Sequence, residues 1–363
     1  MLKVLDNYNG TPVGLFTGDE HLGGLSPIRG TELCAVVEQM YSYERLFLKT
    51  GDYKWLDRLE VIAFSALSAT ISDDMWAHQY DQMSNQISCQ KILGHPIFGT
   101  NSNDAHIFGL EPNFGCCTSN FSQDWPKFAL SSFAISGDTI ISTMPIPSSL
   151  DCDYANVEVV SDYPFRNFAN YKVTAKHNFT FEIRIPSVCK YATANGLPVY
   201  QKTLSYTLTK GQTLEVLLNF DVDVEIVNRP NNLKAIKRGS LIFALPIEYQ
   251  KIPYEYVKDG VERKFPYCDY EYVGKSDWNY GLSDLEFEFE ERNVSDCPFS
   301  SAQPPIILKA KMKKICWGYA DGHDTVCAKT PKSVSPISVE EEKLLYPYGC
   351  TKLRITEMPL IEE

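Results

Sequence analysis

The hydrophobic periodicity of the chain changes once, near residue 136, and this change is the strongest constraint on the fold. Before "SGDT" at 136–139 apolar residues recur at helical spacing, whereas after it they alternate with polar residues. Runs such as "FTFEIRIP", "TLEVLLNFDVDVEIV", "SLIFALPIEY" and "LEFEFEE", separated by turn residues, are typical of antiparallel strands. The sequence therefore predicts an α+β multidomain protein, with a helical portion followed by one or more antiparallel β-sandwich domains.

The helical portion begins with a predicted antiparallel hairpin over residues 32–72. Two apolar stripes define it, the first formed by Val36, Val37, Met40, Tyr41 and Phe47, and the second by Trp55, Leu59, Ile62, Ala63, Ala66 and Leu67. Between them, "TGD" at 50–52 offers a glycine that ends one helix and an aspartate that caps the next. Such hairpins repeat in bundles, solenoids and helical toroids.

The rest of the helical portion is less regular. Residues 73–118 are rich in Asp, Gln, Asn, Gly and Pro and are predicted to form long functional loops rather than packed elements. A last helix is predicted from about Ser119 to Ala134, with Pro126 either kinking it or marking where regular helix begins. We therefore expect three portions: a helical one over 1–136, a β-sandwich over 137–236, and a second β-rich portion over 237–363, divided near "KRG" at 237–239.

Composition narrows the class of protein. The 363 residues carry a formal net charge of -12 with no run of Lys and Arg, which argues against nucleic-acid binding and favours a neutral or cationic substrate or partner. No stretch of eighteen apolar residues occurs, so no membrane span is expected. The N-terminal "MLKVLDNYNGTPVG" lacks the features of a secretory signal, and the compartment and the oligomeric state stay open.

Two short motifs place cysteines at predicted helix entrances. Glu32 and Cys34 open the first helix, and Cys116 and Cys117 precede the last one after the flexible Gly115. Residues two apart in a regular helix point about 200° away from each other, so the first pair can converge only where the helix is just beginning. Converging, the four residues would form a Cys3Glu zinc site. The alternative from spacing alone is three buried thiols, a solvated glutamate and no metal.

Four segments together resemble glycoside hydrolase family 127, the family of β-L-arabinofuranosidases. They are "RGTELCAVVEQMYSYERL", "HQYDQMSNQISCQ", "FGLEPNFGCCTSNFSQDWPKFA" and "LYPYGCTKLRITEMP", and they occur in the family's order. The resemblance implies an (α/α)6 toroid with appended β-sandwiches and a zinc ion held by Glu32, Cys34, Cys116 and Cys117. It further implies that Cys116 is the nucleophile and that a glutamate upstream of Glu32 is the general acid and base.

The same resemblance guides the remaining site predictions. Glu20, in "TGDEHLGG" twelve residues before Glu32, is our prediction for the acid/base, with Asp19 and Glu38 as competitors. The polar side chains predicted to hydrogen-bond sugar hydroxyls are His78, Gln79, Tyr80 and Asn85, with Asp81 and Gln86 beside them. Trp76 or Tyr80 can lie against a sugar ring. Carbohydrate, an arabinose-containing glycan or a related one, is thus the expected ligand.

The helical portion is too short for a complete (α/α)6 toroid. Only two or three hairpins fit before residue 136, whereas an (α/α)6 toroid has six, and members of the family normally carry several hundred more residues upstream. We therefore expect a partial toroid, the C-terminal part of a longer enzyme. Two functions remain: a retaining glycosidase that cleaves terminal L-arabinofuranosides or related glycans, or an inactive fragment or pseudoenzyme with a structural zinc site and β domains that bind carbohydrate or a partner.

Overall fold

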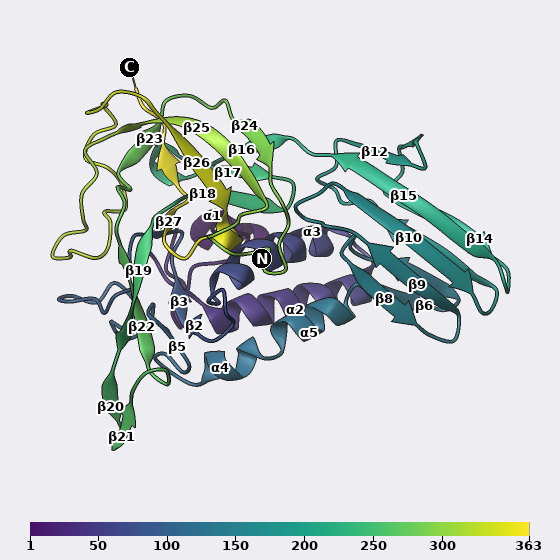
Figure 1. The fold of residues 1–363 in the computed structure, drawn as a ribbon, viewed down its shortest axis with the longest axis horizontal. Coiled ribbons are helices and arrows are strands. Elements are labelled where there is room, and N and C mark those ends of the chain that lie inside the picture. The colour runs from purple at the N-terminus through teal and green to yellow at the C-terminus, as the bar shows by residue number, and fades with distance from the viewer. Residues whose placement is uncertain (363) are drawn as a thin grey trace.

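The predicted helical hairpin is present in the computed structural model, which describes residues 1–362. Helix α2 (Leu33–Thr50) packs against α3 (Lys54–Ile62), which continues into a π-helical turn, η1 (Ala63–Leu67) (Figure 1). Gly51 ends α2 in the left-handed conformation, with φ of 67°, and its N–H bonds the Phe47 carbonyl. Asp52 then accepts the N–H of Lys54 at 3.1 Å. The "TGD" turn therefore acts as predicted, as the end of one helix and the start of the next.

Most of the predicted apolar stripes lie in the core. Val36, Val37 and Met40 are buried, as is the second stripe from Leu59 to Leu67. Tyr41 is the exception, because it is 37% exposed and its ring lies 4.0 Å below the Lys127 ammonium group. The prediction that Tyr41 faces inward is wrong, since its polar hydroxyl and this cation–π contact favour the surface.

The last predicted helix is broken in two and ends early. Helix α4 (Cys116–Phe121) is followed by α5 (Asp124–Leu130), so the break lies at residues 122–123, and Pro126 lies in the first turn of α5. The chain then enters strand β6 (Phe133–Ser136), whose residues pair with β7 (Thr139–Ser142). Phe133 and Ala134 were predicted to be helical, and this prediction is wrong because the ladder with β7 fixes them in extended conformation.

The helices do not form a recognisable part of an (α/α)6 toroid in the described residues. Helix α1 (Leu2–Asn9) lies near the N-terminus, and α3, α4 and α5 all contact the long helix α2. The predicted partial toroid is thus corrected to a small layer of helices beside extensive antiparallel sheet (Figure 1). The residues between η1 and α4, which further hairpins would need, are rich in Asp, Asn, Gly and Pro and are not helical.

Two sheets form the sandwich at the right of Figure 1. One has the strand order β14-β11-β7-β6 and the other β13-β12-β15-β10-β9-β8, and all pairs are antiparallel except β7 with β11. The remaining bounds are β8 (Ser148–Asp151), β9 (Ala155–Val160), β10 (Phe168–Ala175), β11 (Phe179–Arg184), β12 (Tyr191–Ala194), β13 (Leu197–Val199), β14 (Thr203–Leu208) and β15 (Thr213–Asp221). Inward residues alternate with exposed ones along β9 and β10, and Tyr171 of one sheet meets Phe181 of the other.

The C-terminal sheet has the order β16-β17-β18-β26-β25-β23, with shorter strands added to it. Its strands are β16 (Val224–Asn228), β17 (Leu233–Arg238), β18 (Leu241–Pro246), β23 (Tyr280–Leu282), β24 (Glu288–Glu291), β25 (Ile306–Lys314), β26 (Glu341–Pro347), β27 (Arg354–Ile355) and β28 (Met358–Pro359). Short 3-10 turns occur at η2 (Pro230–Asn232) and η3 (Tyr348–Cys350). Strand β15 is the last strand of the sandwich, and β16 is the first strand of the C-terminal sheet. The division of the chain after residues 136 and 236 stays a prediction. Residue 363, the last of the predicted third portion, lies outside the described residues.

Residues 77–89, predicted to be functional loops, are instead packed in the interior. Two-residue strands hold them: β1 (Thr31–Glu32) pairs with β3 (Asp81–Gln82), and β4 (Asn85–Gln86) pairs with β27. Strand β2 (His78–Gln79) pairs with β5 (Phe108–Gly109), which continues to β22 (Asp269–Gly274) and β19 (Tyr249–Tyr254). The hairpin of β20 (Tyr256–Lys258) and β21 (Val261–Arg263) projects beyond them. Gln79 and Gln86 of this segment bond each other, while other polar side chains bond groups elsewhere in the chain, as Asn85 does with the Glu357 carbonyl. These hydrogen bonds permit burial of the polar segment.

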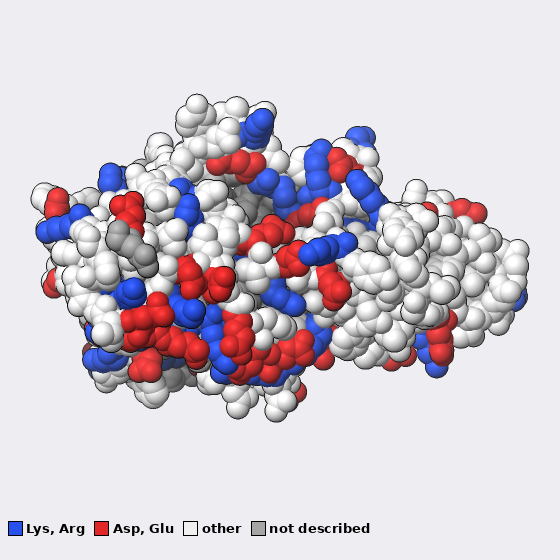
Figure 2. Space-filling view, turned by 90° about the horizontal axis from the view of Figure 1, so that it is seen from above, with Lys and Arg blue, Asp and Glu red and all other residues white. Residues whose placement is uncertain are grey.

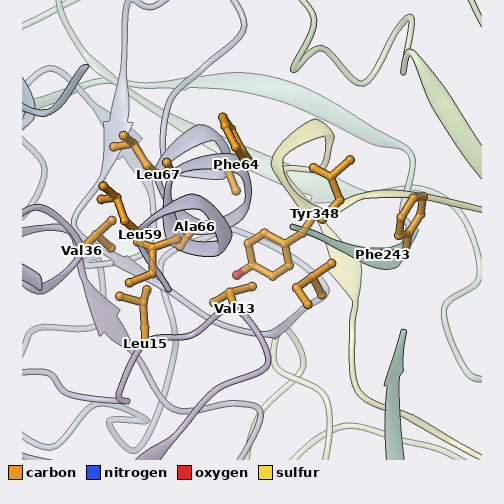
Figure 3. Packing of buried hydrophobic residues seen from close by; sticks show 14 of the residues in the cluster. Val13, Leu15, Val36, Leu59, Phe64, Ala66, Leu67, Phe243 and Tyr348 are labelled. Carbon is orange, nitrogen blue, oxygen red and sulfur yellow. The ribbon is translucent and has the colours of Figure 1, made fainter. Parts of the chain in front are cut away.

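The C-terminal segment closes the core over these buried strands. Tyr348 and Phe243 lie near Phe64 and Ala66 of η1 (Figure 3), and the Tyr348 hydroxyl donates to Gln82 Oε1 at 2.8 Å. The Asn85 side-chain oxygen accepts the N–H groups of Thr356 and Glu357, both at 2.9 Å. Residues from the two ends of the sequence therefore share one core.

A glycine marks the tightest point of this contact. A Cβ placed on Gly349 would lie 2.8 Å from the backbone oxygen of Phe64 and 2.8 Å from the Phe299 ring. We expect Gly349→Ala to lower the free energy of unfolding by about 1–3 kcal/mol, because well-packed cores resist added volume. Urea denaturation measures this. Gly318→Ala is the matched control, since a Cβ there meets nothing within 4 Å, and an equal loss in both variants would contradict the packing explanation.

A charged cluster joins α3 to both β portions. Arg184 of β11 is fully buried and bonds the buried Glu60 through Nη1 at 2.5 Å, and it also pairs with Asp57. The other carboxylate oxygen of Glu60 accepts hydrogen bonds from Tyr163 at 2.5 Å and from Ser240 at 2.9 Å. These five residues are called the Glu60 cluster below.

Two buried carboxyls, Glu44 of α2 and Asp124 of α5, make stability depend on pH. Burial raises the pKa of Asp124 to about 8 and that of Glu44 to about 7. Both groups ionise near pH 4 in an unfolded chain. Their folded pKa values are higher, so their contribution to stability is present below about pH 4 and is lost as the pH rises through 7 and 8.

We expect the stability of Asp124→Asn relative to the wild type to increase by about 1–2 kcal/mol or more between pH 5 and pH 9, because the variant has no charge to bury. Urea midpoints at the two pH values test this, with Asp138→Asn, at an exposed turn, as the control. A wild-type advantage that grows from pH 5 to pH 9 would show that the Asp124 carboxylate is stabilised in the folded protein.

Charges are mixed on the surface. In Figure 2, Lys and Arg lie interspersed with Asp and Glu to the left of the sandwich, while the sandwich end, at the right, is mostly uncharged on this face. None of the helices within residues 1–362 has the length and apolar character needed to span a membrane.

Candidate metal centre

The four predicted metal ligands converge in the fold. One ligand atom from each of Glu32, Cys34, Cys116 and Cys117 lies within 4.8 Å of all the others. Cys34 Sγ is 3.3 Å from Cys117 Sγ, and Glu32 Oε1 is 3.7 Å from Cys116 Sγ and 3.8 Å from Cys117 Sγ. Separations of this size suit the corners of a tetrahedron around one ion, because zinc–sulfur bonds are about 2.3 Å long.

The backbone explains how residues so close in sequence can point to one place. Glu32 ends strand β1 and caps α2 with an extended conformation, φ of -68° and ψ of 139°, so it does not share a regular helix with Cys34. Strand β1 is fixed from both sides, since Glu32 N bonds Gly18 O at 3.1 Å and Leu33 N bonds Tyr80 O at 2.8 Å. Cys116 begins α4 directly after Gly115. The helix entrances thus do bring the two pairs together.

Electrostatics indicate that the cluster suits a cation. A hydrogen bond from Cys117 lowers the pKa of Cys34, whereas burial raises the pKa of Cys116 and the bond to Cys34 raises that of Cys117. The pKa values of two of the three thiols are thus raised above the ordinary value. A bound metal would stabilise all three thiolates together with the Glu32 carboxylate. The donor set of three sulfurs and one carboxylate fits zinc.

The tandem cysteines differ in exposure and neighbours. Cys117 is fully buried against Cys34. Cys116 is partly exposed, and its sulfur lies 3.3 Å from the Tyr80 hydroxyl, which donates in turn to Glu20 Oε1 at 3.1 Å. Tyr80 thus links Glu20 to Cys116, and burial raises its pKa far above the ordinary value, so it stays a neutral phenol.

The three candidates for the acid/base, Glu20, Asp19 and Glu38, lie in different surroundings. Glu20 is exposed and has a positive φ of 79°, an uncommon conformation for a glutamate. Asp19 is buried, and its carboxylate accepts the N–H groups of Gly99 and Thr100, so it holds a neighbouring loop. Glu38 is on the exposed side of α2. Of the three, Glu20 is joined to Cys116 through Tyr80.

The predicted sugar-binding residues are positioned differently from one another. Tyr80 lies at the cluster, and His78 is buried with its Nε2 3.0 Å from Thr118 Oγ1, next to the tandem cysteines. Gln79 is fully buried and donates to the His106 carbonyl at 2.6 Å, while Asn85 holds the C-terminal segment. The side-chain amides of Gln79 and Asn85 are therefore engaged inside the protein. Trp76 is 40% exposed and lies with Tyr267.

Sequence reasoning missed two neighbours of the cluster. The Asn120 side chain hydrogen-bonds Cys34 and lowers its pKa, and Thr118 orients His78. Asn120 is four residues after Cys116, on the same face of α4, and this spacing was the available signal. Asp81, opposite Glu32 in the β1–β3 pair, has a strongly raised pKa because it is buried.

Among the comparisons with known proteins, the comparison of structures is the one that finds similar proteins. No protein-family model matches the chain, and no curated protein matches its sequence. The structure is similar to Ara127N-Se, a GH127 β-L-arabinofuranosidase from Geobacillus stearothermophilus T6, with a TM-score of 0.62 and 15% identity over 97% of this chain and 54% of that one.

Two further solved structures are similar. The GH127 β-arabinofuranosidase BT3674 matches with a TM-score of 0.61 and 16% identity, over 98% of this chain and 54% of that chain. A glycoside hydrolase matches with a TM-score of 0.60 and 14% identity, over 100% of this chain and 61% of that chain. The chain spans little more than half the length of these structures. Over nearly its whole length, it shares its fold with about half of a GH127 β-L-arabinofuranosidase.

Proposed function

We propose that the chain belongs to a retaining glycoside hydrolase that cleaves terminal L-arabinofuranosides or related glycans, with Cys116 as nucleophile and Glu20 as acid and base. The observation that supports this most is the Tyr80 hydroxyl, which lies 3.1 Å from Glu20 Oε1 and 3.3 Å from Cys116 Sγ. A nucleophile and a carboxyl group near one hydroxyl, beside a cluster of metal-binding residues, is an arrangement suited to glycoside cleavage.

Zinc is the ion that we propose for the cluster, held by Glu32, Cys34, Cys116 and Cys117. When bound, it would keep the thiols deprotonated at neutral pH, where a free thiol with a pKa of about 8.5 is mostly protonated. Cys117 is fully buried, whereas Cys34 and Cys116 are both partly exposed. Cys116 is the one whose sulfur lies beside the Tyr80 hydroxyl, so we take it as the sulfur that attacks the sugar and the other two as fixed ligands.

The proposed reaction has two displacements. The Cys116 thiolate attacks the anomeric carbon and forms a carbon–sulfur bond, while the glycosidic carbon–oxygen bond breaks and the Glu20 carboxyl gives its proton to the departing oxygen. The Glu20 carboxylate then takes a proton from water, whose oxygen attacks the same carbon and releases the thiolate. Two inversions give net retention. Tyr80 donates to Glu20 and orients it.

A closed structural metal site is the second candidate function. Glu32 and Cys34 belong to the start of α2, and the tandem cysteines belong to α4, so an ion there would fasten the two helices together. The sheets would then serve to bind carbohydrate or a partner. Cys117, fully buried, favours this role for at least part of the cluster.

Metal analysis together with an activity assay tests the proposal. We expect about one zinc per chain in purified wild type, none in the Cys116→Ser/Cys117→Ser double variant, and release of nitrophenol from p-nitrophenyl β-L-arabinofuranoside by the zinc-loaded protein. Zinc binding without hydrolysis of arabinofuranosides or related glycosides would favour the structural alternative. Folded, reduced wild type without zinc would exclude both candidates.

Tyr80→Phe is a sharper test of the catalytic geometry. The ring is buried and keeps its packing, but the variant loses the hydroxyl that contacts Glu20 and Cys116. We expect kcat/KM to fall about 10–100-fold with the melting temperature little changed, because orientation of the acid/base is lost. Tyr280→Phe, which removes a hydroxyl bonded to Glu341, is the control. Equal activity in both variants would contradict a positioning role for Tyr80.

A further inference from the structure

An exposed cleft of about 480 Å³ has none of the four residues of the metal cluster in its lining. Its lining residues are Asp74, Trp76, Lys251, Pro253, Phe265, Pro266 and Tyr270. They come from the turn after η1, from strand β19, and from the segment that leads into β22, at the left of Figure 1. None of them is a predicted metal ligand or acid/base, so the proposed reaction leaves this cleft unexplained.

The cleft presents aromatic rings to solvent in fixed positions. Trp76 is 40% exposed, and Phe265 and the adjacent Tyr267 are 66% and 63% exposed. The Trp76 indole N–H and the Tyr270 hydroxyl both donate to the Pro266 carbonyl, at 3.1 and 2.7 Å. The rings of Trp76 and Tyr267 lie 5.8 Å apart. These large aromatic side chains are exposed and yet held rigidly. Little of the free energy of ligand binding is therefore lost in ordering the protein.

The turn that carries Trp76 is itself well braced. Asp74 Oδ1 accepts the N–H of Trp76 at 3.1 Å, and Ser72 Oγ accepts the N–H of Ala77 at 2.9 Å. Across the cleft, Glu255 accepts the N–H of Phe265 at 3.0 Å. The two walls of the cleft are therefore ordered before any ligand binds.

The polar groups of the cleft indicate the class of ligand. Asp74 and Lys251 form an ion pair at 3.7 Å, and both remain partly exposed, so each can still hydrogen-bond a ligand hydroxyl. The pair is neutral overall, which disfavours a charged ligand. Sugar rings have faces of weakly positive C–H bonds, which stack on the negative faces of aromatic rings, and hydroxyl edges, which need hydrogen bonds.

We propose that this cleft is a second carbohydrate site, which binds a neutral oligosaccharide against Trp76 and Phe265, with Asp74 and Lys251 on its hydroxyls. The inference rests on the proposed function only for its choice of a glycan as ligand. Its role would be to hold a glycan chain at the protein while another part of it is cleaved.

Binding of arabinohexaose to wild type labelled with 5-fluorotryptophan tests the proposal, with xylohexaose as a second probe. The chain has five tryptophans, so the fluorine spectrum is simple, and Trp76→Phe assigns the Trp76 resonance. We expect that resonance to shift with saturation at millimolar saccharide. Trp76→Ala and Phe265→Ala should each weaken binding by about tenfold or more, whereas Tyr200→Ala, at an 85% exposed position of the sandwich, should not.

The outcomes distinguish failure of the second site from failure of the proposed function. A Trp76 resonance that does not respond to either saccharide overturns the second site, while zinc content and nitrophenol release still test the proposed function. A shift that depends on protein concentration without saccharide identifies a second copy of the chain as the occupant and also overturns it. Saccharide binding at Trp76 without nitrophenol release supports the second site and contradicts only the proposed function.

Discussion

Cys116→Ser should lower turnover of an arabinofuranoside by about a thousandfold or more while the protein stays folded. A serine hydroxyl is far less acidic than a thiol, so it supplies neither a ready nucleophile nor a good ligand. Cys116 is the partly exposed cysteine of the pair and the one beside Tyr80, so its loss should affect chemistry more than packing. Steady-state kinetics, zinc content and melting temperature, all measured on one preparation, check this.

Cys117→Ser is the matched comparison, because it changes the neighbouring residue in the same way. Cys117 is fully buried and contacts both Cys34 and Glu32. We expect this variant to lose zinc and to melt at a lower temperature, with activity falling in proportion to the zinc lost. If both variants lose zinc, stability and turnover in the same proportions, the two cysteines are equivalent and the cluster is a structural site.

Arg184→Met should destabilise the protein by about 3–5 kcal/mol, the largest effect that we expect away from the cysteines. The substitution keeps much of the side-chain volume but leaves the Glu60 carboxylate, which is fully buried, without its cation. Urea denaturation followed by circular dichroism measures the change. Lys190→Met is the control, because its ion pair with Asp223 is 67% and 58% exposed and such pairs contribute about 0–1 kcal/mol.

A second variant separates charge from packing in the Glu60 cluster. Adding Glu60→Leu to Arg184→Met removes the unpaired carboxylate, so part of the lost stability should return. A double variant less stable than either single one would instead show that the hydrogen bonds from Tyr163 and Ser240 to Glu60 carry the stabilisation. An Arg184→Met variant no weaker than Lys190→Met would contradict the whole account.

Local signals in the sequence were sufficient for part of the fold. The hairpin of α2 and α3 was predictable because its stripes and its "TGD" turn are contained within some forty residues, and helix formation depends on neighbours. The convergence of Glu32 and Cys34 with the tandem cysteines followed from helix entrances, together with the family resemblance. Pro126 likewise gave a local signal of a break, which the structure has a few residues earlier, before α5 begins at Asp124.

Burial of the polar segment was not predictable in the same way. The sequence "HQYDQMSNQISCQ" has the composition of an exposed loop, and its side chains become buried only because partners arrive from far along the chain. Gln86 donates to the Lys352 carbonyl, and Asn85 binds the backbone of Glu357. Composition alone cannot reveal a partner some 270 residues away. The link from Tyr80 to Glu20 and Cys116 was hidden for the same reason.

The clasp between Asn85 and the C-terminal segment also has a consequence for synthesis. The chain around Asn85 leaves the ribosome long before residues 356–357, which its side chain must bind. Until those residues emerge, strand β4 lacks its partner β27, and the Asn85 side chain lacks the backbone groups that it binds. This part of the core can therefore be completed only after nearly all of the described chain has been synthesised.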